Sequence, residues 1–146
     1  MGGRKKDKRV GFLLESTTRI VKLCFNKAFT QLDVDITPEQ WVVLDTLMDR
    51  GPLSQVDISG IIFKDAPTVS RLIDQLERKG FLNRLPSETD RRATVIKITT
   101  EGKNLVDHCL KEVKQLRELT WKNLSEEDYN HFTRIINQVF NNMQSY

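Results

Sequence analysis

Apolar side chains recur every three or four residues along most of this chain, and in one short region they alternate instead. The first spacing is typical of amphipathic helices, because it places the apolar residues on a single face. A wide apolar face of this kind predicts a first helix from Val10 to Leu32. The remaining predicted helices cover about 37–50, 54–62 and 65–79, and two more follow Thr99 and Ser125.

The predicted helix ends carry recognisable stop and start signals. The segment Thr37–Gln40 has the pattern of a capping box with proline in the first turn, and Ser54 and Asp65 are expected N-caps. Gly51 and Pro52 break the second helix, since proline lacks an N–H and fixes φ. These signals divide the middle of the chain into short helices joined by tight turns.

A β-hairpin is predicted directly after the fourth helix, which ends at Gly80. Its strands cover 81–85 and 93–98, and the polar segment 86–92 forms the tip between them. Ile96 and Ile98 alternate with a polar residue, which indicates one buried face. The expected fold is therefore mainly α with a small β wing, formed by a helix-turn-helix followed by a hairpin.

The fourth helix has two contrasting faces. Its apolar residues follow the i, i+3, i+4, i+7 spacing of a buried stripe and are Val69, Leu72, Ile73 and Leu76. The opposite face is polar and carries Thr68, Ser70, Arg71, Asp74, Gln75 and Arg78. A polar helix face beside a hairpin is the arrangement expected of a protein that binds DNA.

Charge strengthens this interpretation through its position. The formal net charge of +3 is too small to imply a nucleic-acid partner. Residues 78–97, however, hold six Lys or Arg against Glu88 and Asp90, a local charge of +4. Residues 1–9 hold another +4, which we interpret as a solvated basic tail rather than a DNA-contacting arm.

The linked motifs resemble the MarR family of bacterial transcription regulators. The residues that carry the resemblance are 65–81, Arg84, 90–92, 98–99 and Gly102. The resemblance implies a winged helix-turn-helix core over 37–98, with dimerisation helices over 10–32 and 100–146. It also implies a homodimer that binds a pseudo-palindromic operator, usually as a repressor, and responds to a small aromatic or amphipathic effector. The two cysteines lie 85 positions apart and indicate no disulfide framework, so we expect a reducing cytoplasm.

The resemblance also suggests which residues contact double-stranded DNA. Base reading is carried over to the start of the fourth helix, at Ala66, Pro67, Thr68, Ser70 and Arg71. Ser54 and Gln55 are candidates for phosphate contacts at a helix N-terminus.

In the wing, Asp90 is expected to brace an arginine side chain by a charge-assisted bond. By resemblance Arg92 enters the minor groove and Arg91 contacts the DNA backbone, although both are chemically able to enter.

Other interpretations carry less weight. Phe12, Phe25, Phe29 and Trp41 could line an effector crevice, but aromatic residues at helical spacing are more often core, which we prefer. Cys24 and Cys109 lie among apolar neighbours, so we expect small hydrophobes rather than redox sensors. A cysteine-based redox regulator and a winged-helix protein adaptor remain the alternatives.

Enzymatic chemistry has little support. His108 and His131 fall on separate predicted helices, and neither a metal-binding spacing nor a Gly-rich phosphate loop is present. We expect no catalytic residues, cofactor or metal. No apolar run reaches the length of a membrane span, and the basic N-terminus lacks the apolar segment of a secretory signal.

Overall fold

A computed structural model describes residues 9–146, so the predicted basic tail over 1–9 lies almost wholly outside the described residues. The chain divides into two compact units, with the boundary between Glu112 and Val113. The helices of the described part are α1 (Val10–Gln31), α2 (Pro38–Arg50), α3 (Gln55–Ile62), α4 (Ala66–Arg78), α5 (Thr100–Thr120) and α6 (Glu126–Gln144).

The helix starts follow from the capping residues that the sequence predicted. Thr37 and Gln40 form both bonds of a capping box at α2, each at 3.1 Å. The Ser54 hydroxyl accepts a hydrogen bond from the backbone N–H of Asp57 at the start of α3. The Asp65 carboxylate accepts one from the N–H of Thr68, which fixes the first turn of α4.

The hairpin forms as predicted and is held on both sides. Strands β1 (Leu82–Pro86) and β2 (Thr94–Ile98) pair antiparallel, with Leu82 opposite Ile98. On the other side of β2, Leu53 exchanges two backbone hydrogen bonds with Ile96, of 3.1 and 2.7 Å. The base of the hairpin is thereby attached to the segment that leads into α3.

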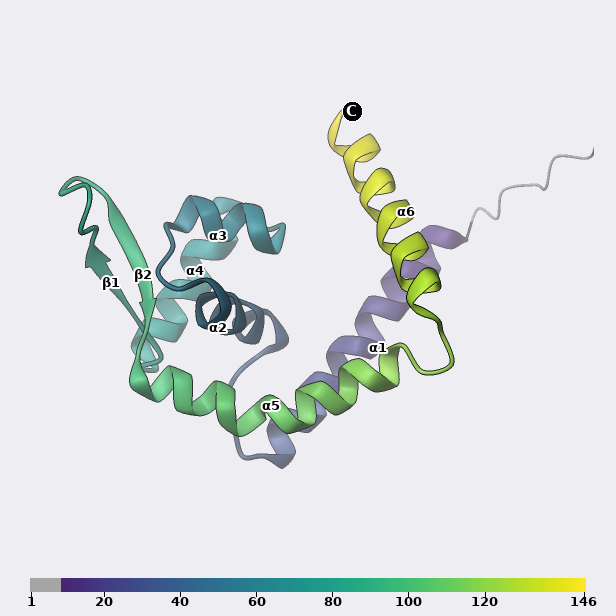
Figure 1. The fold of residues 1–146 in the computed structure, drawn as a ribbon, viewed down its shortest axis with the longest axis horizontal. Coiled ribbons are helices and arrows are strands. Elements are labelled where there is room, and N and C mark those ends of the chain that lie inside the picture. Colours follow the sequence, from purple (N-terminus) through teal and green to yellow (C-terminus); the bar gives the residue numbers. More distant parts are fainter. Residues whose placement is uncertain (1–8) are drawn as a thin grey trace, which may run out of the picture. The chain divides into compact units, whose positions relative to one another are not determined.

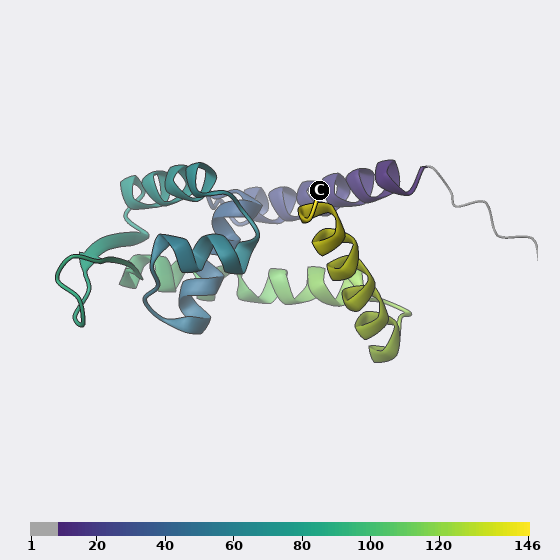
Figure 2. The same ribbon diagram turned by 90° about the horizontal axis from the view of Figure 1, so that it is seen from above.

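The core of the first unit lies around α4. All four apolar residues predicted for its buried face are at most 6 % exposed, and α2, α3 and β1 pack against this helix. Figures 1 and 2 show α2, α3 and α4 grouped together, with the tip of the hairpin extending away from them. The fold therefore buries one face of α4 and leaves the other face and the hairpin tip in solvent.

Two glycines allow the chain to turn between α4, the hairpin and α5. Gly80 has φ +80°, a left-handed conformation that other residues rarely adopt. Its carbonyl accepts a hydrogen bond from the Thr99 hydroxyl at 2.7 Å. A Cβ at Gly102 would lie 2.2 Å from the Phe81 carbonyl oxygen, so only glycine lets α5 begin this close to the base of the hairpin.

A buried glutamine joins α2 to α4. Gln40 is 3 % exposed, and its side-chain amide donates to the Gln75 side-chain oxygen at 2.9 Å. The Lys79 ammonium at the end of α4 donates to the Gln40 side-chain oxygen at 3.3 Å and to the Asp35 carbonyl at 2.7 Å. One side chain thus caps α2 and ties it to α4.

A further ion pair joins α1 to α2. The Lys22 ammonium contacts the Glu39 carboxylate. Partial burial, the largest single cause, would raise the pKa of Glu39, but hydrogen bonds from Lys22 and the backbone and the charges of Lys22 and Lys64 together lower it below the usual value. In the second unit, the Trp121 ring makes edge contacts with Tyr129 and Phe132 at the start of α6.

In the part of the chain that the structure describes, no helix is both long and apolar enough to cross a membrane.

We predict that Gln40→Ala lowers the free energy of unfolding by about 2–3 kcal/mol, because it removes one helix cap and leaves buried partners without hydrogen bonds. Urea unfolding followed by far-UV circular dichroism, at one protein concentration, measures this. The control is Gln31→Ala, at an exposed position at the end of α1, which should change stability by at most about 0.5 kcal/mol. Equal losses in both variants would contradict the structural role of Gln40.

Candidate nucleic-acid interface

The exposed face of α4 presents the residues predicted to read DNA. Ala66, Pro67 and Arg71 are exposed, and Thr68 and Ser70 are half-buried near the start of the helix. Pro67, Arg71, Asp74 and Arg78 follow the i, i+4, i+7, i+11 spacing of a single exposed stripe, opposite the buried face. The burial pattern thus leaves the predicted reading residues accessible from one side.

The Asp65 carboxylate completes the start of α4. Bonds from the Thr68 side chain and backbone N–H lower the pKa of Asp65. The cap keeps this carboxylate charged, and it orders the turn from which the reading residues project.

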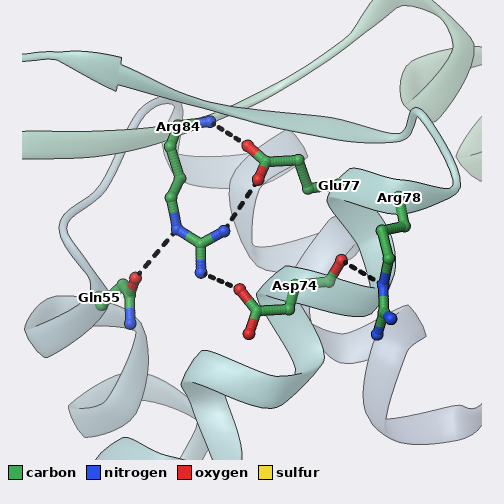
Figure 3. A network of polar contacts seen from close by, with 5 residues as sticks. All are labelled: Gln55, Asp74, Glu77, Arg78 and Arg84. Carbon is green, nitrogen blue, oxygen red and sulfur yellow. Dashed lines mark hydrogen bonds and ion pairs between the residues drawn. The ribbon is translucent and has the colours of Figure 1, made fainter.

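Ser54 and Gln55 lie where the sequence placed them, at the start of α3. Both are half-buried, and the Ser54 hydroxyl is engaged as the helix cap. The Gln55 side-chain oxygen accepts a hydrogen bond from Nε of Arg84 at 3.4 Å. Its Nε2 points away from Arg84 and can donate to another group (Figure 3).

The tip of the wing is a tight turn with arginine at both central positions. The backbone N–H of Ala93 donates to the Asp90 carbonyl at 3.0 Å, which places Arg91 and Arg92 at positions two and three of a β-turn. The Ser87 hydroxyl accepts bonds from the N–H groups of Thr89 and Asp90. Both arginines are exposed at the end of this hydrogen-bonded loop.

Asp90 acts on the backbone of this turn. Its carboxylate accepts a hydrogen bond from the backbone N–H of Arg92 at 3.0 Å, rather than bracing an arginine side chain as the sequence suggested. This is the usual role of aspartate at the first position of a turn, where its short side chain reaches two residues ahead. Asp90 therefore fixes the conformation of the turn and leaves both guanidinium groups exposed.

An arginine on β1 joins the wing to both helices of the helix-turn-helix. The Arg84 guanidinium donates to Asp74 at 2.5 Å and to Glu77 at 2.9 Å, both on α4, and its Nε donates to Gln55 on α3 (Figure 3). The backbone N–H of Arg84 also donates to Glu77, at 3.0 Å. Partial burial would lower the pKa of Arg84, but the two carboxylates outweigh it and raise the pKa, so the group stays charged.

Arg84 is one of the residues that carry the resemblance to the MarR family, but the sequence assigns it no role. A signal was present, because Asp74 and Glu77 are three residues apart and therefore lie on neighbouring parts of one helix surface. Arg84 lies ten positions after Asp74 and seven positions after Glu77, so it can pair with both only because the hairpin folds back along α4. The sequence pattern alone did not show that fold-back.

The four aromatic residues considered as an effector crevice do not form one group of ring contacts. Phe29 and Trp41 are at most 2 % exposed, and their rings lie 5.8 Å apart, which supports the core interpretation for this pair. Phe25 is half-buried and meets Phe29 edge to face. Phe12 is 70 % exposed, near the start of α1. The buried Trp41 Nε1 has no hydrogen-bond partner among the described residues.

The two cysteines differ from each other. Cys109 is buried as expected, and burial raises the pKa of its thiol to about 11, so it is protonated near neutral pH. Cys24 is exposed in the single chain, although its sequence neighbours on α1 include apolar residues. Within residues 9–146, no cluster of His, Cys, Asp or Glu is arranged to hold a metal ion.

A helix-turn-helix with an exposed reading helix and a hairpin tipped by two arginines defines a winged-helix DNA-binding protein. Comparison with known proteins gives the family. Residues 36–94 match the model of the MarR family. The chain is 30% identical over 96 residues to the multiple antibiotic resistance protein MarR of Escherichia coli K12, covering 65% of this chain and 67% of that protein. The chain belongs to the MarR family of transcription regulators.

Solved structures agree with this assignment. The S. aureus MepR–DNA complex matches with a TM-score of 0.79 and 26% identity, over 91% of this chain and 95% of that one. BpsR of Bordetella bronchiseptica, whose DNA binding is regulated by 6-hydroxynicotinic acid, matches with a TM-score of 0.78 and 25% identity. That alignment covers 94% of this chain and 97% of BpsR, so the similarity extends well beyond the winged helix.

Proposed function

We propose that this protein is a dimeric repressor that binds a pseudo-palindromic operator and releases it when a small aromatic or amphipathic effector binds. The observation that carries the proposal is the joint exposure of Arg71 on α4 and of Arg91 and Arg92 at the wing tip. A dimer covering its operator would repress by excluding other proteins from that DNA. The protein would then act in the cytoplasm, where the chromosome lies, and would have no catalytic role.

Within this proposal, residues 37–98 form the DNA-binding part, and 10–32 and 100–146 form dimerisation helices. Arg71 pairs with base edges in the major groove, where guanidinium groups recognise guanine, and the neighbouring Thr68 and Ser70 contact bases or phosphate. Gln55 Nε2 and the N-terminus of α3 contact the DNA backbone. The wing arginines enter or flank the adjacent minor groove, where negative potential is concentrated.

Exposed apolar residues on two helices support the dimer. On α1 these include Phe12, Leu13, Ile20 and Leu23, which are 55–70 % exposed. No residue of α6 is buried, although it carries an apolar stripe. That stripe contains Phe132, Ile135, Val139 and Met143. Surfaces of this kind mark contacts with another protein surface, and a second copy is the partner that the family implies.

The dimer is tested by placing a charge in the stripe of α6. Ile135→Asp should convert the dimer to a monomer and weaken operator binding, because a carboxylate cannot be buried unpaired at an apolar interface. Sedimentation equilibrium at micromolar concentration measures the mass. Asn137→Asp adds the same charge on the polar side of α6 and should leave the dimer intact. A wild-type protein that sediments as a monomer would contradict the proposed dimer.

DNA binding is tested with a labelled duplex that the protein itself selects from a random-sequence pool. Fluorescence anisotropy should show affinity that falls steeply with added salt, through release of counterions from the DNA. Arg92→Ala should weaken binding by about 1–3 kcal/mol at fixed salt. Arg134→Ala, on the polar side of α6, is the matched control and should bind as the wild type does. Failure of the wild type to select any duplex would favour a protein-interaction role.

The effector is proposed to interact near Trp41. Its indole N–H is buried and unpaired among the described residues, so an aromatic effector that carries an acceptor and displaces the side chains around Trp41 would satisfy this donor. A panel of aromatic carboxylates that includes 6-hydroxynicotinic acid should contain a compound that weakens operator binding. Trp41→Phe keeps a flat ring but removes the donor, so it should bind the same duplex and respond less. An undiminished response in Trp41→Phe would place the effector elsewhere.

A further inference from the structure

The contacts of Arg84 point to a role that neither base reading nor groove insertion includes. Its three side-chain nitrogens each donate to a different residue, two on α4 and one on α3, while its backbone belongs to the wing (Figure 3). We propose that Arg84 is a positioning residue that fixes the wing relative to the reading helix, so that the wing arginines and α4 can engage one DNA duplex together. This inference rests on the proposed DNA-binding function.

The wing needs such a contact because of its size. A two-stranded hairpin of five-residue strands is marginally stable by itself, so its direction depends on what it packs against. Backbone pairing between Leu53 and Ile96 holds β2 to the segment before α3. On the opposite side, Glu77 accepts the backbone N–H of Arg84 at the outer edge of β1. Arg84 is thus a polar link between β1 and α4, through Glu77 and Asp74.

The geometry also distinguishes Arg84 from a direct DNA contact. Its side chain is only 27% exposed, and its guanidinium nitrogens are already engaged with protein acceptors. The exposed arginines Arg71, Arg91 and Arg92 lie on the α4 stripe and at the turn of the wing instead. A planar guanidinium can serve three partners in fixed directions, whereas the single ammonium of lysine cannot reproduce this geometry.

The ion pair between Arg84 and Asp74 also changes the charge of the exposed stripe of α4. Asp74 belongs to the exposed stripe of α4, between Arg71 and Arg78, where an unpaired carboxylate would repel DNA phosphates. The ion pair with Arg84 offsets this negative charge. Removing the carboxylate by Asp74→Asn would strengthen DNA binding if charge alone mattered. If position matters, the same change loosens the wing and reduces the contribution of its arginines.

The test is a double-mutant cycle on the selected duplex, with anisotropy at fixed salt. Replacing Arg91 and Arg92 together by alanine should weaken binding at least about ten-fold in the wild-type background. In an Arg84→Met background the same replacement should cost less than about three-fold, because a wing that is no longer held contributes little. Arg84→Lys should behave like Arg84→Met, since charge without the three-way geometry does not hold the wing.

The matched control is Lys97→Met, which removes one positive charge from the outward face of the same hairpin. In that background the wing arginines should keep their full ten-fold effect. Minor-groove hydroxyl-radical protection at the wing site should fade in Arg84→Met but persist in Lys97→Met. Thermal melting confirms that each variant is folded, and Asp74→Asn supplies the measurement if Arg84→Met does not fold.

Two results distinguish a failure of the positioning role from a failure of the proposed DNA-binding site. An equal effect of the wing replacement in the wild-type, Arg84→Met and Asp74→Asn backgrounds would overturn the positioning role while leaving DNA binding intact. A wild-type protein that binds no duplex, or a wing replacement without effect in the wild type, would overturn both the proposed site and the positioning role.

Discussion

The structure of the first unit depends on one helix, α4, having two faces that serve different purposes. Its apolar face is almost fully buried against α2, α3 and β1. That burial fixes the rotation of the helix about its own axis, because a small rotation would expose apolar side chains. The exposed stripe that includes Arg71 is therefore oriented by the core. Packing of the buried face therefore also holds the reading surface of α4 in place.

The hairpin is oriented differently, because it has only a small apolar face of its own. Ile96 and Ile98 are buried at its base, while its tip extends into solvent. Polar contacts therefore orient the hairpin where apolar packing is too small to do so. Asp90 and Ser87 order the turn through backbone N–H groups, and Arg84 attaches β1 to α4. Charged side chains at the tip can then be accessible and also well placed, which a flexible loop of the same composition would not achieve.

Local features of the fold could be predicted from the sequence, and contacts between distant segments could not. The caps at Thr37, Ser54 and Asp65 involve residues three positions apart, so their chemistry is visible in the sequence. The bond from Gln40 to Gln75 spans 35 positions and depends on packing between α2 and α4. Gln40 was recognised as part of a cap, but its second role needed the tertiary structure.

In the candidate site, too, local features could be predicted from the sequence and contacts between distant segments could not. The exposure of Arg71 follows from the periodicity of α4, and a turn at 86–92 was expected from its composition. The bond from Asp90 to a backbone amide was not predicted, because the identity of a residue does not tell whether a nearby backbone N–H or a side chain will lie within reach. The backbone amide of Arg92 is closer in a tight turn, and it needs no ordering of a long side chain. Similarly, the role of Arg84 depends on the register of the hairpin against α4.

The exposed apolar residues of α6 connect the stability of this helix with the proposed dimer. Most of the stability of a helix in a protein comes from burying an apolar face, and no residue of α6 is buried in the single chain. The capping box at Ser125 and the ring contacts of Trp121 order its first turns. They leave the stripe beyond Phe132 in solvent, so a second copy that covers it would stabilise α6 directly. Dimerisation would then stabilise α6, and the spacing of two reading helices, about 34 Å for adjacent turns of the major groove, would depend on how the dimer packs. An effector that alters how these helices pack would change DNA affinity without touching the reading face.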